Sequence, residues 1–286
     1  QLGCGLLSLK GPAVSANIYT GISRGEDKML IPKIGVQLFT LREYIQNYED
    51  TEKLFAFLQR IGADVIQISG IGPIEPEKVA FLVNKYRMDV CVTHKDFNRM
   101  LNDLDNLIAE HKMMGCDCIG IGSMPSESRK SAESVREFIK QVNEIGKKMR
   151  AQGVQFAYHN HAFEFEKFGD KTVMDMLIEE TDPEYVHFIP DIYWIQVGGE
   201  NPAEYIKRLK GRVKVCHFKD GEIESDCPMI TELGVGEVDL DACFKACMEL
   251  DIPYIVYEQD NNFDEDALKS TEVSFKYLQD LVKANS

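Results

Sequence analysis

The chain has 286 residues, 44% of them hydrophobic and 28% charged, the composition of a globular protein with ample material for a core. Its formal net charge of −15 argues against a nucleic acid as partner, because phosphate backbones bind basic surfaces. A small anionic substrate is not excluded, since it needs only a local basic patch. No run of about 18 apolar residues is present, which argues against a membrane span.

The first 32 residues differ in composition from the rest of the chain. A small and apolar stretch at Gln1–Leu9 is followed by Ala13-Val14-Ser15-Ala16, whose small residues suit signal-peptidase cleavage. We therefore expect an N-terminal extension over residues 1–32, made of an export-signal remnant and a linker, which would place the protein in the periplasm. A disordered cytoplasmic extension is the alternative. The folded domain is expected over residues 33–286.

From residue 34 onward, short apolar runs alternate eight times with longer amphipathic stretches. The expected strands are Ile34–Phe39, Val65–Ser69, Val90–His94, Cys118–Gly122, Val154–Asn160, Val186–Pro190, Val213–Phe218 and Tyr254–Gln259. Runs that are apolar on both faces are typical of strands buried in a parallel sheet. Apolar residues at helical spacing predict helices from Thr51 to near Gly62 and over Pro76–Tyr86, Asn98–Met114, Ala132–Met149, Val173–Glu180, Ala203–Leu209, Leu240–Leu250 and Asp264–Val282.

Eight such units are compatible with a closed barrel or with an open, doubly wound sheet. An open sheet that binds a dinucleotide usually has a glycine-rich turn after its first strand, but this turn reads Thr40-Leu41-Arg42-Glu43. The sequence therefore predicts an α/β fold of the (β/α)₈ TIM-barrel type, in which catalytic residues lie at the C-terminal ends of the strands.

Polar side chains occur at the C-terminal ends of most of the predicted strands. A lone polar residue at such a place is more often a satisfied structural group, but in a barrel these ends converge. The residues singled out are Gln37, His94, His159, Asn160, His161, Asp191, Trp194, His217, Lys219 and Glu258.

Carboxylates and imidazoles gathered in this way suit one divalent ion such as Mn²⁺, Mg²⁺, Co²⁺ or Zn²⁺. Six of the eight cysteines fall in strand-like apolar runs or in a predicted helix, in positions typical of buried free thiols, so no thiolate set competes for a softer metal. A metal at the strand ends would polarise a carbonyl, and a nearby carboxylate or imidazole could remove the adjacent carbon-bound proton. The resulting enediolate leads to isomerisation, epimerisation or dehydration.

Several motifs together make the sequence resemble a known family. They are Ile34-Gly35-Val36-Gln37-Leu38, Tyr158-His159-Asn160-His161 with Glu164-Phe165, Asp191, His217-Phe218-Lys219-Asp220, Gly234-Val235-Gly236-Glu237-Val238-Asp239 and Glu258-Gln259-Asp260. The chain is similar to the xylose isomerase-like TIM-barrel superfamily of sugar phosphate isomerases and epimerases, in a branch with the Tyr-His-Asn-His motif.

The resemblance implies a metal site made by side chains that follow strands five to eight. Three of the ligands fall on Asp191, His217 and Glu258. Many relatives have a glutamate where this chain has His159, and the nearest carboxylate is Glu164, five residues further on. Glu164 is therefore the expected fourth ligand, with His159 and His161 as competing candidates.

The same resemblance implies catalytic roles for three residues and a small sugar or polyol as substrate. Glu164 and Glu258 would be the acid/base pair, with His161 as a third proton-transfer candidate. The residues expected to orient substrate hydroxyls are Gln37, His94, His159, Asn160, Trp194 and Lys219. Sugar isomerase or epimerase activity is the main hypothesis. An inosose dehydratase-like enzyme and a non-catalytic carbohydrate-binding barrel are the alternatives, and a homo-oligomer is left open.

Overall fold

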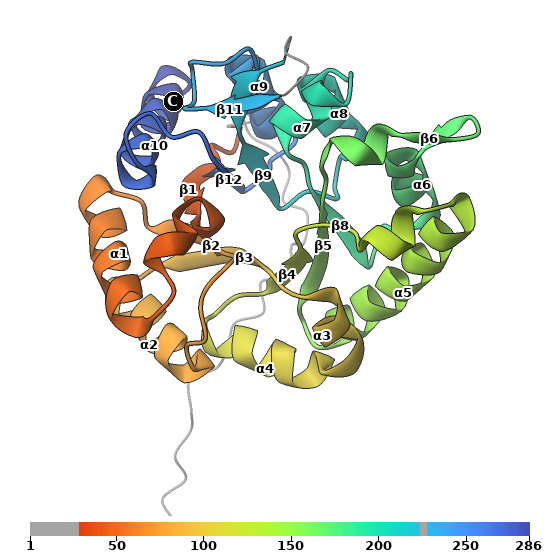
Figure 1. Cartoon of the computed structure of the whole chain (residues 1–286), viewed down its shortest axis with the longest axis horizontal. Helices are drawn as coiled ribbons and strands as arrows, with labels where there is room; N and C mark the ends of the chain where they lie inside the picture. The colour runs from red at the N-terminus through yellow and green to blue at the C-terminus, as the bar shows by residue number, and fades with distance from the viewer. Residues whose placement is uncertain (1–28, 224–227) are drawn as a thin grey trace, which may run out of the picture.

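Eight parallel strands surround the centre of the computed structural model, which describes residues 29–223 and 228–286 (Figure 1). The strands are β1 (Lys33–Gln37), β2 (Val65–Ile68), β3 (Asp89–His94), β4 (Cys118–Ile121), β5 (Gln155–His159), β8 (Val186–Ile189), β9 (Val215–Phe218) and β12 (Tyr254–Tyr257). Their order is β8-β5-β4-β3-β2-β1-β12-β9, and isolated bridges between Phe188 and Val213 and between Asp191 and His217 link the two ends. The predicted TIM barrel is confirmed, whereas the expected export-signal remnant lies outside the described residues.

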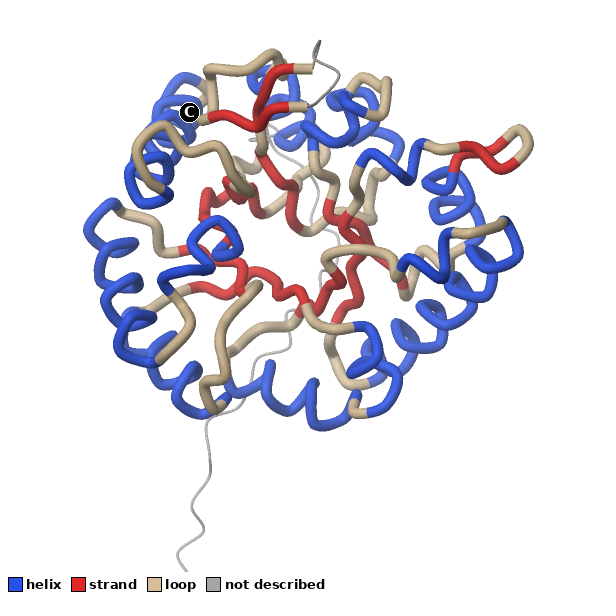
Figure 2. The backbone as a smooth tube through the Cα atoms, in the orientation of Figure 1, coloured by secondary structure: helices blue, strands red, loops and turns tan. Residues whose placement is uncertain are grey.

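Helices form a ring around these strands (Figure 2). They are α1 (Tyr48–Ile61), α2 (Pro76–Tyr86), α3 (Phe97–Asn102), α4 (Leu104–Met113), α5 (Ala132–Ala151), α6 (Val173–Glu180), α7 (Ile192–Val197), α8 (Pro202–Arg208), α9 (Leu240–Glu249) and α10 (Ala267–Ala284). None of the helices in the described part of the chain is long and apolar enough to cross a membrane.

The prediction of a single helix over Asn98–Met114 is wrong, because the structure has two helices there, α3 and α4, which are separated at Asp103. The backbone of Asp103 is non-helical, with φ −143°, and its carboxylate accepts hydrogen bonds from the side chains of Arg99 and Asn106. Aspartate has a low helix propensity and is favoured at helix ends. The helical periodicity continues across the break, so the sequence pattern alone does not show it.

The barrel interior is apolar at one end and polar at the other. A buried cluster from several strands, which includes Val65, Ala157, Ile189, Val215 and Val256, fills the N-terminal part of the interior. Side chains two positions apart on a strand share a face, so the next inward positions lie toward the C-terminal ends. Those positions carry Gln67, His159, Asp191, His217 and Glu258, all of them buried.

The loops at the C-terminal end contain short elements that the sequence periodicity does not reveal. They are the 3₁₀ helices η1 (Leu38–Tyr44), η2 (Ser126–Arg129) and η3 (Ala162–Phe165), and the two-stranded ribbons β6 (Lys167–Phe168) with β7 (Lys171–Thr172) and β10 (Asp220–Glu222) with β11 (Met229–Thr231). The Asp220 carboxylate accepts hydrogen bonds from the backbone N–H groups of Gly234, Gly236 and Val238, so it shapes the glycine-containing loop. The six cysteines in the described residues are buried free thiols, as predicted.

Gly146 allows α5 to pack closely against the barrel. A Cβ at this position would lie 2.3 Å from the backbone oxygen of Tyr185. We expect Gly146→Ala to lower the free energy of unfolding by about 1–2 kcal/mol, because an overpacking cost of up to about 3 kcal/mol exceeds the gain of about 1 kcal/mol in helix propensity. Urea unfolding measures the change, and the exposed neighbour Lys147→Ala is the control. A stability equal to or above wild type would contradict the packing argument.

Candidate active site

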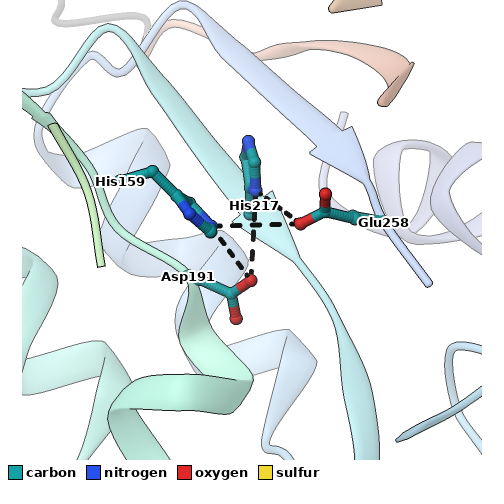
Figure 3. A group of neighbouring side chains, drawn as sticks. All are labelled: His159, Asp191, His217 and Glu258. Atoms are coloured by element: carbon teal, nitrogen blue, oxygen red, sulfur yellow. Dashed lines mark hydrogen bonds and ion pairs between the residues drawn. The ribbon is translucent and has the colours of Figure 1, made fainter. Parts of the chain in front are cut away.

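Four buried side chains meet at the C-terminal end of the barrel (Figure 3). His159 ends β5, Asp191 follows β8, His217 lies in β9 and Glu258 follows β12. One ligand atom from each lies within 4.8 Å of the others, although the residues span 100 positions of the chain. The parallel strand order is therefore what brings them together.

Backbone hydrogen bonds set the relative positions of these residues. The backbone N–H of His217 donates to Pro190 at 2.8 Å, and that of Glu258 donates to Phe218 at 3.0 Å. The Asn160 side-chain oxygen accepts a hydrogen bond from the backbone N–H of Asp191 at 3.0 Å. Asn160 was predicted to orient substrate, and the structure places it, fully buried, against the backbone of Asp191.

The four side chains present two imidazole nitrogens and two carboxylate oxygens to each other. His217 Nδ1 lies 2.9 Å from Glu258 Oε2, and His159 Nε2 lies 3.4 Å from Asp191 Oδ2. The remaining cross distances, from His159 to Glu258 and from His217 to Asp191, are both 3.9 Å. Mixed nitrogen and carboxylate donors in one buried group are a usual ligand set for divalent ions, so this group could hold one.

The ammonium group of Lys219 lies among the carboxylates of the site. Its Nζ is 2.9 Å from Asp191 Oδ2, 3.0 Å from Glu258 Oε2 and 2.9 Å from Asp260 Oδ2. Although burial opposes ionisation, Lys219 holds the pKa values of Asp191 and Glu258 below their usual range, and the carboxylates raise the pKa of Lys219. Asp191 and Glu258 are thus ionised at neutral pH and already attract a cation.

A cavity of about 380 Å³ opens onto this group. It is lined by Phe39, Ser69, Gly70, His94, Gly122, Ser123, His159, His161, Lys219, Glu258 and Asp260. Burial and the neighbouring His159 lower the pKa of His94 well below its usual value and that of His161 to about 3. Both predicted residues therefore present neutral imidazoles to the cavity.

Gln67 is a site residue that the sequence reasoning missed. Its side chain is fully buried at the end of β2, with Oε1 2.8 Å from His217 Nε2 and Nε2 2.9 Å from His94 Nε2. These contacts orient the imidazole of His217 in the four-residue group and that of His94 on the cavity wall. The sequence feature that could have indicated Gln67 is the presence of one polar residue in the apolar run Val65-Ile66-Gln67-Ile68.

Glu164, the expected fourth ligand, lies outside the four-residue group. Its Oε1 accepts a hydrogen bond from the Tyr158 hydroxyl at 2.5 Å, and its Oε2 accepts one from the backbone N–H of His161 at 2.8 Å. The chain turns into η3 directly after β5, so the carboxylate points back toward the strand end. His159 occupies the place in the group that was expected for Glu164.

The burial of Glu164 leads to a pH-dependent stability. Burial raises its pKa from 4.5 to about 7, so the folded protein binds this proton more tightly than the unfolded chain. The stabilisation is complete below about pH 4.5 and is lost as the pH rises through 7. This proton should make the free energy of unfolding on the order of 3 kcal/mol larger at pH 4 than at pH 8, and Glu164→Gln should abolish that contribution. Urea unfolding of both proteins across this range measures it, and parallel pH profiles would contradict the assignment.

Gln37 and Trp194 lie beside the cavity and not in its lining. The Gln37 side-chain oxygen accepts a hydrogen bond from the Phe39 backbone at 3.2 Å and so supports the first strand-to-helix turn. The Trp194 ring is 5.9 Å from His161, between centroids, and 5.3 Å from Lys219 Nζ. A direct contact of either side chain with substrate stays a prediction.

Sequence comparisons find inosose dehydratases among the relatives of this chain. The chain is 33% identical over 81 residues to inosose dehydratase of Salmonella typhimurium (strain LT2), which is 28% of this chain and 26% of that protein. It is 26% identical over 149 residues to inosose dehydratase 2 of Bacillus cereus (strain ZK), which is 49% of this chain and 48% of that protein. The matched segments thus span between a quarter and half of these relatives.

Solved structures show the same fold over nearly the whole chain. A sugar phosphate isomerase/epimerase from Parabacteroides distasonis superposes with a TM-score of 0.70 and 22% identity, covering 87% of this chain and 94% of that one. The IOLI protein with a bound zinc atom superposes with a TM-score of 0.70 and 15% identity, covering 88% and 98%. The model of the xylose isomerase-like TIM barrel family matches residues 36–279. Since this match runs from the first strand of the barrel into its last helix, the chain belongs to the xylose isomerase-like TIM barrel family.

Proposed function

We propose that the protein is a divalent-metal-dependent sugar isomerase or epimerase that moves a proton on a carbon next to a carbonyl. The observation that carries the proposal is the buried group of His159, Asp191, His217 and Glu258 beside a cavity of about 380 Å³. The family match, together with structural neighbours that include an L-ribulose 3-epimerase, supports this class of reaction.

The residues present fit a divalent ion. Two imidazole nitrogens and two ionised carboxylates form the donor set, and the Lys219 ammonium already occupies a position between the carboxylates. Asp191, His217, Glu258 and His159 would hold the ion, with His159 in the place first expected for Glu164. When bound, such an ion polarises a substrate carbonyl and so acidifies the neighbouring C–H bond.

Glu258 is the proposed proton acceptor. Its carboxylate lines the cavity and stays ionised, because Lys219 and His217 lower its pKa although burial opposes this. An ionised carboxylate on the cavity wall can accept a proton from a bound substrate and return it to the neighbouring carbon. His161, a neutral imidazole on the same wall, is the proposed second proton-transfer group.

A dehydratase acting on a keto-polyol or keto-sugar is the second candidate. Two observations favour it, the matches to inosose dehydratases and the displacement of Glu164 from the cavity. Without Glu164, one carboxylate of the expected acid/base pair remains at the substrate. A single base suffices for β-elimination, in which Glu258 takes the carbon-bound proton and the β-hydroxyl leaves as water after receiving a proton from a cavity side chain.

Incubation with keto-sugars and inososes in D₂O, with Mn²⁺ added, tests the proposal. An isomerase or epimerase incorporates deuterium without loss of water from the substrate, and a dehydratase gives a product lighter by one water molecule. Mass spectrometry and proton NMR distinguish the two outcomes. Tight sugar binding without either reaction would support the non-catalytic carbohydrate-binding barrel and overturn the enzymatic proposal.

A further inference from the structure

We infer that the cavity is built for an unphosphorylated, uncharged polyhydroxy carbonyl compound and rejects sugar phosphates. The inference rests on the proposed function and concerns the substrate class of the same site. Two observations support it. The charged groups around the cavity are already paired with each other, whereas some neutral polar atoms of the cavity lining have no hydrogen-bond partner.

The one ammonium group that lines the cavity among the described residues has no free donor. A lysine ammonium has three N–H donors. Lys219 Nζ lies 2.9, 3.0 and 2.9 Å from carboxylate oxygens of Asp191, Glu258 and Asp260, respectively. A phosphate entering the cavity would have to displace one of these carboxylates before it could bind the ammonium group.

The sum of the formal charges also disfavours an added anion. With the imidazoles neutral, the formal charges of the three carboxylates and Lys219 sum to −2, and one divalent ion would bring this sum to zero. A phosphate ester would add nearly two negative charges to a buried site without surplus positive charge. Uncompensated charge is costly to remove from water, so such a ligand should be rejected.

Two arginines that lie near cavity residues in the chain, Arg42 and Arg129, are engaged with other groups. Arg42 donates hydrogen bonds to the backbone oxygens of Phe39 and Asp260 at 2.9 and 3.0 Å. The Arg129 guanidinium lies 3.9 Å from the centroid of the Phe163 ring. Neither side chain lines the cavity, so neither supplies the bidentate contacts with which arginine usually recognises phosphate.

Neutral polar atoms, in contrast, lack partners at this site. Ser69 Oγ and His161 Nδ1 belong to cavity-lining residues and have no hydrogen-bond partner among the described residues. Buried polar atoms without partners are unfavourable, and the hydroxyl groups of a sugar or cyclitol would satisfy them.

Matched pairs of ketoses and their phosphate esters test the inference on the full chain with Mn²⁺. Ribulose, xylulose, fructose and tagatose are each compared with their phosphate esters in the deuterium-exchange assay. We expect exchange at least about tenfold faster for a free ketose than for its ester, because the ester brings like charges together in a buried site. Calorimetry with inorganic phosphate gives a readout independent of catalysis, and we expect no saturable binding.

A charge variant makes the test sharper. Asp260→Asn frees one donor of Lys219 and removes one negative charge, so phosphate binding should become detectable by calorimetry. Asp264→Asn, the same change at an exposed position, should leave phosphate binding undetectable. Faster exchange with the phosphate esters would overturn the inference and leave the proposed function standing. If no ketose, no phosphate ester and no inosose exchanged a proton, the proposed function would be overturned, and the inference with it.

Discussion

Glu258→Gln is expected to reduce substrate proton exchange by a factor of about 10² to 10⁴, the usual contribution of a general base. The amide nearly preserves the shape of the side chain but cannot accept the proton. It also removes one of the three carboxylates around Lys219. Exchange is measured at saturating Mn²⁺, so that weaker metal binding does not account for the loss.

Two controls make the Glu258 result interpretable. Circular dichroism shows whether the buried substitution preserves the barrel, and exposed Glu265→Gln changes the same charge outside the cavity. We expect wild-type exchange rates for Glu265→Gln. Exchange within about threefold of wild type in folded Glu258→Gln would show that another group accepts the proton, and His161 would then be tested in the same way.

Loss of His159 is expected to weaken Mn²⁺ binding by more than about 100-fold. Removing a hydrogen bond that supports a metal ligand already lowers the metal affinity about 10- to 100-fold. Removing the ligand itself should lower the metal affinity at least as much. In His159→Ala the group retains Asp191, His217 and Glu258. Glu164→Gln should bind Mn²⁺ as wild type does, because Glu164 bonds to Tyr158 and His161 outside the group.

Calorimetry of the wild type, both variants and His161→Ala separates the three residues considered for the fourth ligand. From the geometry, we expect a large loss of Mn²⁺ affinity for His159→Ala and for neither of the other two variants. If Glu164→Gln lost the metal and His159→Ala kept it, the carboxylate would have to swing out of its contacts with Tyr158 and His161. The ligand set proposed from the structure would then be wrong.

Much of the fold follows from local sequence patterns. Each of the eight expected strands is present to within two residues at either end, as for Val65–Ser69 against the observed Val65–Ile68. Buried parallel strands and amphipathic helices show distinct periodicities, which depend on local geometry. The break at Asp103 and the short C-terminal elements depend on side-chain hydrogen bonds and tight turns, which these periodicities do not record.

The motif Tyr158 to Phe165 shows why the sequence could not decide the site completely. It offers two histidines and a glutamate within six residues, and any of them could have completed the group. The end of β5 at His159 and the turn into η3 direct one imidazole inward and the Glu164 carboxylate backward. Which side chain faces the centre depends on where the strand ends, and this is set by pairing with β4 and β8.

The sequence by itself determined the barrel and the convergence of Asp191, His217 and Glu258, because periodicity places each of them at the end of a buried strand. The tertiary structure decided that His159 joins them, that Gln67 contacts His217 across 150 residues, and that Lys219 is enclosed by three carboxylates. These contacts join side chains far apart in the sequence, and their distances follow only from closure of the sheet. Closure also leaves the charges around the cavity paired, from which we infer an uncharged substrate.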